Sequence, residues 1–124
     1  MSDVRNHEER VTDNLEQLLE IVPGRFVSHL KKMDGIDELI EIVMDLGRIP
    51  EARFPGRWVY LGDDVVRPED LEHAINRVGS FSGDNRAGIE RTLHRISAIR
   101  NRQGKIIGMT CRVGRAILGT IDII

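Results

Sequence analysis

The sequence contains a single cysteine, Cys111, and no apolar run of the length that a membrane-spanning helix requires. One cysteine excludes a disulfide within the chain, and no stretch near the start resembles a secretory signal. The 124 residues suffice for one hydrophobic core that needs neither disulfides nor metal ions. These absences predict a cytoplasmic protein without membrane insertion, built around one core.

Motifs for metal binding and catalysis are also missing. None of the four histidines has a second ligand at metal-binding spacing, and they fall in different expected elements: His7, His29, His73 and His94. Cys111 lies on an alternating strand beside apolar residues, which favours a buried, inert thiol over a nucleophile. Adjacent carboxylates have structural explanations in a tail, a turn and a helix start: Glu8-Glu9, Asp63-Asp64 and Glu69-Asp70. We therefore expect no metal site and no catalytic residue in this chain.

The glycine-rich stretch at residues 80–88 also lacks a nucleotide motif. It contains neither the Gly-Lys-Ser/Thr of a phosphate loop nor the Gly-x-Gly-x-x-Gly of a dinucleotide fold. We interpret it as a loop or a single helical turn. The whole chain likewise has no Walker A lysine, so we expect no ATP hydrolysis from this chain alone.

Two short amphipathic helices are expected near the start of the chain. The first repeats leucine at helical spacing and ends at Pro23-Gly24, while the second covers about residues 25–32. Together they predict a helical hairpin over residues 12–35. The polar residues 1–11 that precede it are expected to form a flexible N-terminus.

The middle of the chain predicts strands followed by a helix. A run rich in β-branched residues favours a strand over residues 39–46, and the Pro55-Gly56 turn joins two more at residues 52–54 and 57–61. Short connections of this kind indicate an antiparallel meander. Pro68 then begins a helix, because proline suits the first turn and acidic residues follow it.

A basic segment at residues 91–115 combines a hairpin pattern with seven cationic side chains and no carboxylate. Gln103-Gly104 is the expected turn, and the first strand starts near Arg95 or contains a bulge. The second strand alternates between two faces, the first with Ile107, Met109, Cys111 and Val113 and the second with Ile106, Gly108, Thr110 and Arg112. The Arg112 guanidinium is therefore expected to point away from the buried face.

The formal net charge of −2 conceals an uneven distribution of charge along the chain. Residues 1–90 carry 11 Lys and Arg against 19 Asp and Glu, whereas residues 91–124 carry seven against one. The basic end of the chain either attracts an anionic ligand, or its positive charge is neutralised by the acidic part of the chain on one mixed surface. The candidates for binding phosphate are Arg95, Arg112 and Arg115, because a guanidinium presents two parallel donors. Their alternative role is to pair with carboxylates of the first 90 residues.

Three stretches carry a resemblance to a known family: Val43-Met-Asp-Leu-Gly-Arg-Ile-Pro-Glu-Ala-Arg-Phe54, the segment from Phe81 to Gly104, and Thr110-Cys-Arg-Val-Gly-Arg115. Over residues 12–124 the chain resembles the N-terminal region of a cyanobacterial and plastid P-loop ATPase family. Longer members of that family also carry a C-terminal single-stranded nucleic-acid-binding domain. More distantly, the chain is similar to stage III sporulation protein AA and to the N-terminal domains of type II and type IV secretion ATPases.

This resemblance implies an α+β fold over residues 36–118, in which a curved antiparallel sheet packs with helices. It implies that residues 119–124 begin a linker toward a P-loop ATPase core. It also implies that the full-length protein uses ATP and Mg²⁺ and forms a homo-oligomer. The implied location is the cytoplasm or the plastid stroma. In the secretion ATPases, arginines of this domain approach the nucleotide phosphates. The matching positions here are Arg95, Arg112 and Arg115.

Three hypotheses for function follow. The leading one is a non-catalytic regulatory and oligomerisation domain that contributes basic residues to nucleotide phosphates at a domain interface. The second is a nucleic-acid-binding module that uses the basic hairpin at residues 91–115. Single-strand binders stack bases on aromatic side chains, and all the aromatics here precede that hairpin: Phe26, Phe54, Trp58, Tyr60 and Phe81. The third is a structural adaptor that makes protein contacts only.

Overall fold

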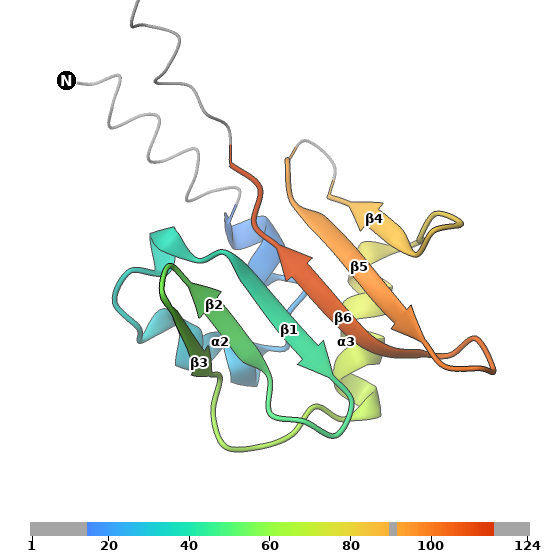
Figure 1. Ribbon diagram of the computed structural model, residues 1–124, viewed down its shortest axis with the longest axis horizontal. Coiled ribbons are helices and arrows are strands. Elements are labelled where there is room, and N and C mark those ends of the chain that lie inside the picture. The colour runs from blue at the N-terminus through green and yellow to red at the C-terminus, as the bar shows by residue number, and fades with distance from the viewer. Residues whose placement is uncertain (1–14, 90–91, 116–124) are drawn as a thin grey trace, which may run out of the picture.

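The computed structural model describes residues 15–89 and 92–115 and confirms an α+β fold (Figure 1). Its strands form one six-stranded sheet in the order β3-β2-β1-β6-β5-β4, with every neighbouring pair antiparallel. The strands are β1 Glu41–Asp45, β2 Glu51–Phe54, β3 Arg57–Tyr60, β4 Arg86–Gly88, β5 Arg95–Arg100 and β6 Ile106–Arg112. The sheet is open at both ends, so β3 and β4 form its edges.

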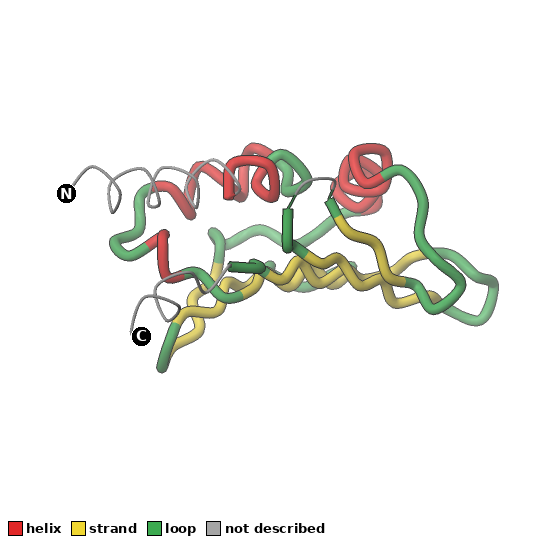
Figure 2. Tube along the Cα trace, turned by 90° about the horizontal axis from the view of Figure 1, so that it is seen from above, coloured by secondary structure: helices red, strands yellow, loops and turns green. Residues whose placement is uncertain are grey.

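Helices cover one face of this sheet and leave the other face uncovered by helix, as the edge-on view shows (Figure 2). The helical segments are residues 15–19, α2 Gly24–Lys31, a 3₁₀ turn at Ile36–Glu38 and α3 Pro68–Val78. The two expected N-terminal helices and the helix beginning at Pro68 are therefore confirmed within the described residues. The expected N-terminal tail at residues 1–11 and the linker at residues 119–124 lie outside those residues.

The hydrophobic core lies between the sheet and the helices. From the sheet come Ile42, Met44, Ala52, Phe54, Ile96, Met109 and Cys111, and from the helices Leu18, Phe26, Leu30, Leu71 and Ala74. Within each strand these residues occupy alternate positions, since successive side chains point to opposite faces. The residues between them therefore face away from the helices.

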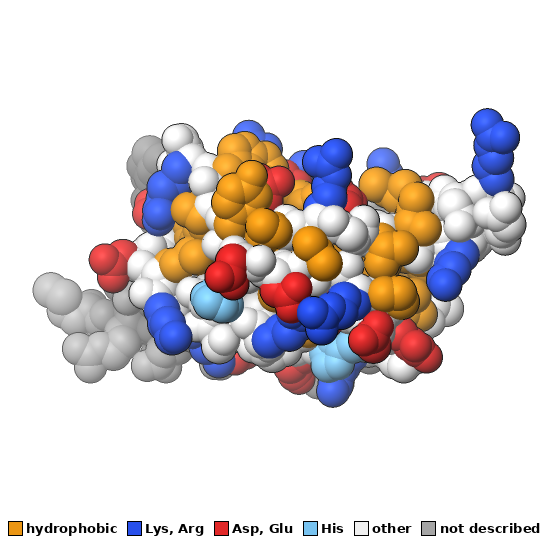
Figure 3. Space-filling model, turned by 90° about the horizontal axis from the view of Figure 1, so that it is seen from below, with side chains coloured by type: hydrophobic (Ala, Val, Ile, Leu, Met, Phe, Trp, Pro, Cys, Tyr) orange, Lys and Arg blue, Asp and Glu red, His pale blue; other side chains and the backbone are white. Residues whose placement is uncertain are grey.

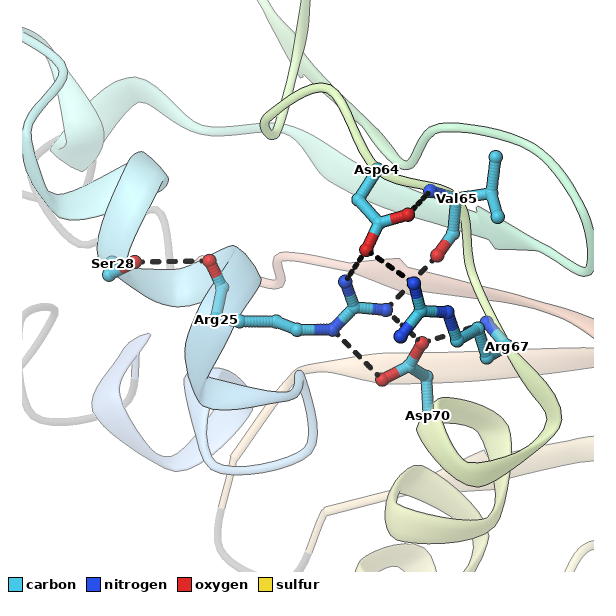
Figure 4. A network of polar contacts seen from close by, with 6 residues as sticks. All are labelled: Arg25, Ser28, Asp64, Val65, Arg67 and Asp70. Atoms are coloured by element: carbon cyan, nitrogen blue, oxygen red, sulfur yellow. Dashed lines mark hydrogen bonds and ion pairs between the residues drawn. The ribbon is translucent and has the colours of Figure 1, made fainter.

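Helix α2 is tied to the start of α3 by a network of charged groups (Figure 4). The Arg25 guanidinium donates to Asp64 at 2.8 Å, to Asp70 at 2.5 Å and to the Val65 carbonyl at 3.0 Å. Asp70 also accepts a hydrogen bond from the Arg67 backbone N–H at 2.7 Å, which caps the first turn of α3. One arginine thus holds two helices and the loop before α3 together.

Two local predictions were wrong. Residues 80–88 were expected to form a loop or a helical turn, but Arg86–Gly88 is a strand because it pairs with β5. Ile106 was expected to face outward, yet it is buried, and Ile107 is only half-buried. The pairing shifts at the end of β5: Ile99 aligns with Gly108 and Arg100 aligns with Ile106, so Ile107 has no partner on β5. The extra residue at this bulge reverses which side chains of β6 point to the core, so that before Gly108 the buried residue is Ile106.

Candidate anion-binding face of the sheet

The face of the sheet that the helices leave uncovered carries a row of charged side chains. Strand pairing aligns Glu41 with Arg53 on one side and with Arg112 on the other. Arg112 in turn aligns with Arg95, and Arg53 with Trp58. Because directly paired residues point to the same side of a sheet, these five side chains form one line across β3, β2, β1, β6 and β5.

Glu41 is the most deeply buried charge in this row. Its side chain is 9% exposed, and its Oε1 lies 3.4 Å from Arg53 Nη1 and 3.5 Å from Arg112 Nη2. The two guanidinium groups therefore share one carboxylate oxygen. Arg112 remains 63% exposed despite this contact, so much of its guanidinium still faces solvent.

A concave region of about 750 Å³ lies over the β4, β5 and β6 side of this face. Its polar lining combines three arginines, two carboxylates and three hydroxyl groups: Arg86, Arg95, Arg112, Glu41, Asp84, Ser82, Ser97 and Thr110. The hydroxyl of Ser82 donates to Asp84 and holds the pKa of that carboxyl below its ordinary value. The lining can therefore offer several guanidinium and hydroxyl donors to one anion.

The structure brings two of the three predicted phosphate-binding arginines together and separates the third. Arg95 and Arg112 are directly opposite each other on β5 and β6 and both line the concave region. Arg115 instead donates to the Leu39 carbonyl at 2.7 Å and to the Asp37 carbonyl, which ties the end of β6 to the 3₁₀ turn. Burial lowers the pKa of its guanidinium from the ordinary value.

The sequence also predicted the orientation of Arg112 and Cys111. Arg112 is exposed and Cys111 is fully buried on the opposite face, which confirms the alternation at these positions. Burial raises the pKa of the Cys111 thiol to about 12, so it is an inert core residue. Arg112 also pairs with Glu41. This contact matches the alternative role given above for the arginines, which is to pair with carboxylates of the first 90 residues.

Sequence reasoning missed several members of this face: Glu41, Arg53, Trp58 and Arg86. Their positions on strands were mostly expected, but the alignment of β1 with β6 joins segments far apart in the chain.

In the described residues 15–89 and 92–115, no three His, Cys, Asp or Glu side chains are grouped so as to hold a metal ion. The same residues contain no helix long and apolar enough to cross a membrane.

Comparison with known proteins identifies relatives in plants and algae. The chain is 59% identical over 114 residues to the uncharacterized protein ycf45 of Porphyra purpurea, 55% identical over 114 residues to the protein SEEDLING PLASTID DEVELOPMENT 1 of Arabidopsis thaliana, and 40% identical over 114 residues to the ycf45 protein of Cyanidium caldarium. These matches cover 91 to 92% of this chain but only 20%, 16% and 34% of the respective relatives. The chain thus spans about a third or less of the length of the curated relatives it matches.

No protein-family profile matches the chain. Among solved structures, the Legionella pneumophila ATPase DotB superposes with a TM-score of 0.43 at 12% sequence identity, covering 71% of this chain and 27% of that chain.

Proposed function

We propose that this chain is a non-catalytic N-terminal domain of an oligomeric P-loop ATPase, and that it presents Arg95 and Arg112 to nucleotide phosphates at a domain interface. The observation that carries the proposal is the direct pairing of these two arginines on the uncovered face of the sheet. The phosphates would be held by the ATPase core of the same protein or of a neighbouring subunit.

The arginine pair is unfavourable without an anion. Like charges directly opposite each other on paired strands destabilise a sheet, and Glu41 offsets only the Arg112 side of the pair. Arg95 makes no ion pair among the described residues. A phosphate group placed between Arg95 and Arg112 would relieve this repulsion and accept hydrogen bonds from both guanidinium groups.

The residues present fit the phosphate groups of ATP better than its metal ion. Arg86, Arg95 and Arg112 supply donors on one concave region, whereas the described residues offer no acidic cluster for Mg²⁺. We therefore assign the metal ion and the hydrolytic chemistry to the core. The length of the relatives, of which this chain covers 16 to 34%, leaves room for such a core.

For the compartment we propose the plastid stroma or the cytoplasm of a cyanobacterium. The name of the Arabidopsis thaliana protein refers to plastid development, which supports the plastid alternative. Its partners would be its own ATPase core and further copies of the same protein. A ring of subunits would bring the arginine face of one domain next to the nucleotide of another.

Steady-state ATP hydrolysis by the longer protein tests the proposal. Arg95→Ala and Arg112→Ala should each lower kcat at least tenfold, which corresponds to about 1.4 kcal/mol of lost transition-state stabilisation. Arg112→Lys should rescue little, because an ammonium group lacks the paired donors of a guanidinium. Arg48→Ala is the matched control, since Arg48 is exposed, lies outside this face and uses only its backbone in hydrogen bonds.

Two results would overturn the proposal. One is unchanged hydrolysis in both Arg95→Ala and Arg112→Ala, which would favour an adaptor that makes protein contacts only. The other is ATP hydrolysis by the purified 124-residue chain that a point mutation in this chain abolishes, because the domain would then be catalytic itself.

A further inference from the structure

The uncovered face of the sheet also carries two exposed aromatic side chains. Trp58 and Tyr60 are 51% and 62% exposed and lie two positions apart on the edge strand β3. Residues two apart on a strand point to the same face at a spacing of about 7 Å. Trp58 pairs with Arg53, so both rings share the face of the arginine row.

Single exposed hydrophobic side chains are common on protein surfaces, but two large aromatic rings next to each other on one face of an edge strand form a contiguous apolar patch. Seen from below, along an edge of the sheet, hydrophobic side chains lie on the surface in separate groups with acidic and basic side chains between them (Figure 3). Between Trp58 and Tyr60 on the same strand, Val59 points to the opposite face and packs against the hydrophobic core. The exposed parts of the two rings are therefore available to a ligand.

Cationic groups continue from the aromatic pair across the sheet. The Arg53 guanidinium lies over the Trp58 ring, 5.5 Å from its centroid, and also contacts Glu41. Beyond Glu41 the row continues through Arg112 to Arg95. With strands about 4.8 Å apart, the four steps from Trp58 to Arg95 span about 19 Å.

We propose that this face binds single-stranded nucleic acid, with bases stacking on Trp58 and Tyr60 and the backbone running along Arg53, Arg112 and Arg95. Every base has a flat aromatic face, so stacking on two rings requires no particular sequence. The guanidinium groups supply the charge that such a strand needs. The basic hairpin itself has no aromatic side chain, but the sheet places Trp58 and Tyr60 of β3 on the same face as Arg112 and Arg95 of that hairpin.

The negative charge of the carboxylates on this face is compensated in part by arginines. Glu41 is shared by Arg53 and Arg112, so its charge is already compensated. Glu51 lies opposite Tyr60, Asp45 lies on the same face of β1 as Glu41, and Asp84 lies 3.9 Å from Arg86 at the concave region. The described residues 92–115 carry six cationic side chains and no carboxylate, so the field becomes positive from β1 toward the β5–β6 hairpin.

Trp58 is the only tryptophan in the chain, so its fluorescence reports directly on this surface. Titration of the 124-residue chain with single-stranded oligothymidylate should quench the emission saturably. Raising the salt concentration should weaken binding, with a slope on a log–log plot of about −0.7 per phosphate contact. Arg53→Ala and Arg112→Ala should each make that slope shallower by about 0.7.

Fluorescence anisotropy of a labelled oligothymidylate tests the aromatic contribution separately. Trp58→Ala should weaken binding about tenfold, as expected for the loss of one stacked base, while Trp58→Phe should retain most of the affinity. Val65→Ala is the matched control, because Val65 is an exposed hydrophobic residue on the loop before α3. Circular dichroism of each variant checks that its fold is unchanged.

Three results would overturn the inference. They are the absence of binding at low salt, binding that Trp58→Ala leaves unchanged, and quenching by ATP as strong as that by the oligothymidylate. The Trp58→Ala result bears on this inference alone, because Trp58 takes no part in the ATPase proposal. Hydrolysis by the Arg95 and Arg112 variants, measured without nucleic acid, tests that proposal separately.

Discussion

Arg112 Nη2 lies 3.5 Å from Glu41 Oε1 across the β1–β6 pair, and Arg53 Nη1 reaches the same oxygen at 3.4 Å from the other side. Glu41 is therefore the shared partner of two arginines. Neither guanidinium is indispensable to it, because the loss of one leaves the other in place. This sharing decides how each arginine contributes to stability and leaves Arg112 available for a ligand.

Removing Arg112 should cost little stability. In Arg112→Ala, Glu41 keeps its contact with Arg53, and the repulsion between Arg112 and Arg95 disappears. We expect the free energy of unfolding to change by about 0.5 kcal/mol, which chemical denaturation of the 124-residue chain measures. A loss above about 2 kcal/mol would show that the Glu41 carboxylate depends on Arg112, and that this arginine is structural.

Arg115 should behave differently from Arg112. Its guanidinium donates to the backbone carbonyls of Leu39 and Asp37, which no other side chain reaches in the described structure. Arg115→Ala should lower the free energy of unfolding by about 2 kcal/mol, since hydrogen bonds from a charged donor are among the stronger ones. Arg112→Ala serves as the exposed control, and equal effects of the two variants would contradict the structural role of Arg115.

The candidate site could be predicted only in part from the sequence. Alternation along β6 predicted that Arg112 points outward, because neighbouring residues in the chain determine that pattern. The anchoring of Arg115 depends on two backbone carbonyls, and backbone carbonyls leave no signature in a sequence. The alignment of Trp58 and Arg53 with Arg112 depends on the pairing of β1 with β6, which local patterns do not specify.

The fold was more predictable wherever a segment carries its own signal. Strands β1, β2 and β3 follow from β-branched residues and a Pro-Gly turn, and α3 follows from Pro68 and the acidic residues after it. Strand β4 has the sequence Arg-Ala-Gly, which has no strand propensity, and it forms because β5 offers a pairing partner. The reversed burial of Ile106 has the same origin, since a bulge belongs to a strand pair.

Gly114 should not tolerate a side chain. A Cβ at this position would lie 1.9 Å from the Leu93 carbonyl oxygen, which is backbone and cannot rotate away. The Gly114 N–H also donates to His94 Nδ1 at 3.0 Å, so the segment cannot shift without loss of that bond. Gly114→Ala should lower the free energy of unfolding by about 1–3 kcal/mol in chemical denaturation.

Gly24→Ala provides the control for this substitution. A Cβ on Gly24 would meet no atom within 4 Å, and Gly24 is the first residue of α2. Alanine favours a helix over glycine by up to about 1 kcal/mol, so stability should be unchanged or slightly increased. Equal destabilisation by both substitutions would show that Leu93 does not approach Gly114 as the structure has it.

The network around Arg25 should make stability sensitive to acid (Figure 4). The Val65 backbone N–H donates to Asp64, and the guanidinium groups of Arg67 and Arg25 lie 2.9 and 2.8 Å from its carboxylate. These contacts hold the pKa of Asp64 below its ordinary value of 3.8. A carboxyl whose pKa is lower in the folded state stabilises the fold above its unfolded pKa, and this stabilisation is lost as pH falls through the folded value.

Comparison of melting temperatures of the wild type and Asp64→Asn between pH 7 and pH 3 isolates this contribution. Asparagine can still accept the hydrogen bond from Val65 but lacks the charge that Arg25 and Arg67 contact. The wild type should therefore melt higher at pH 7, and the difference should shrink as pH falls below about 4. Asp63→Asn is the control, because the exposed Asp63 side chain makes no ion pair among the described residues. A difference that is constant across this pH range would mean that the effect of Asp64 does not come from its charge, and that the network holds α2 through Asp70 alone.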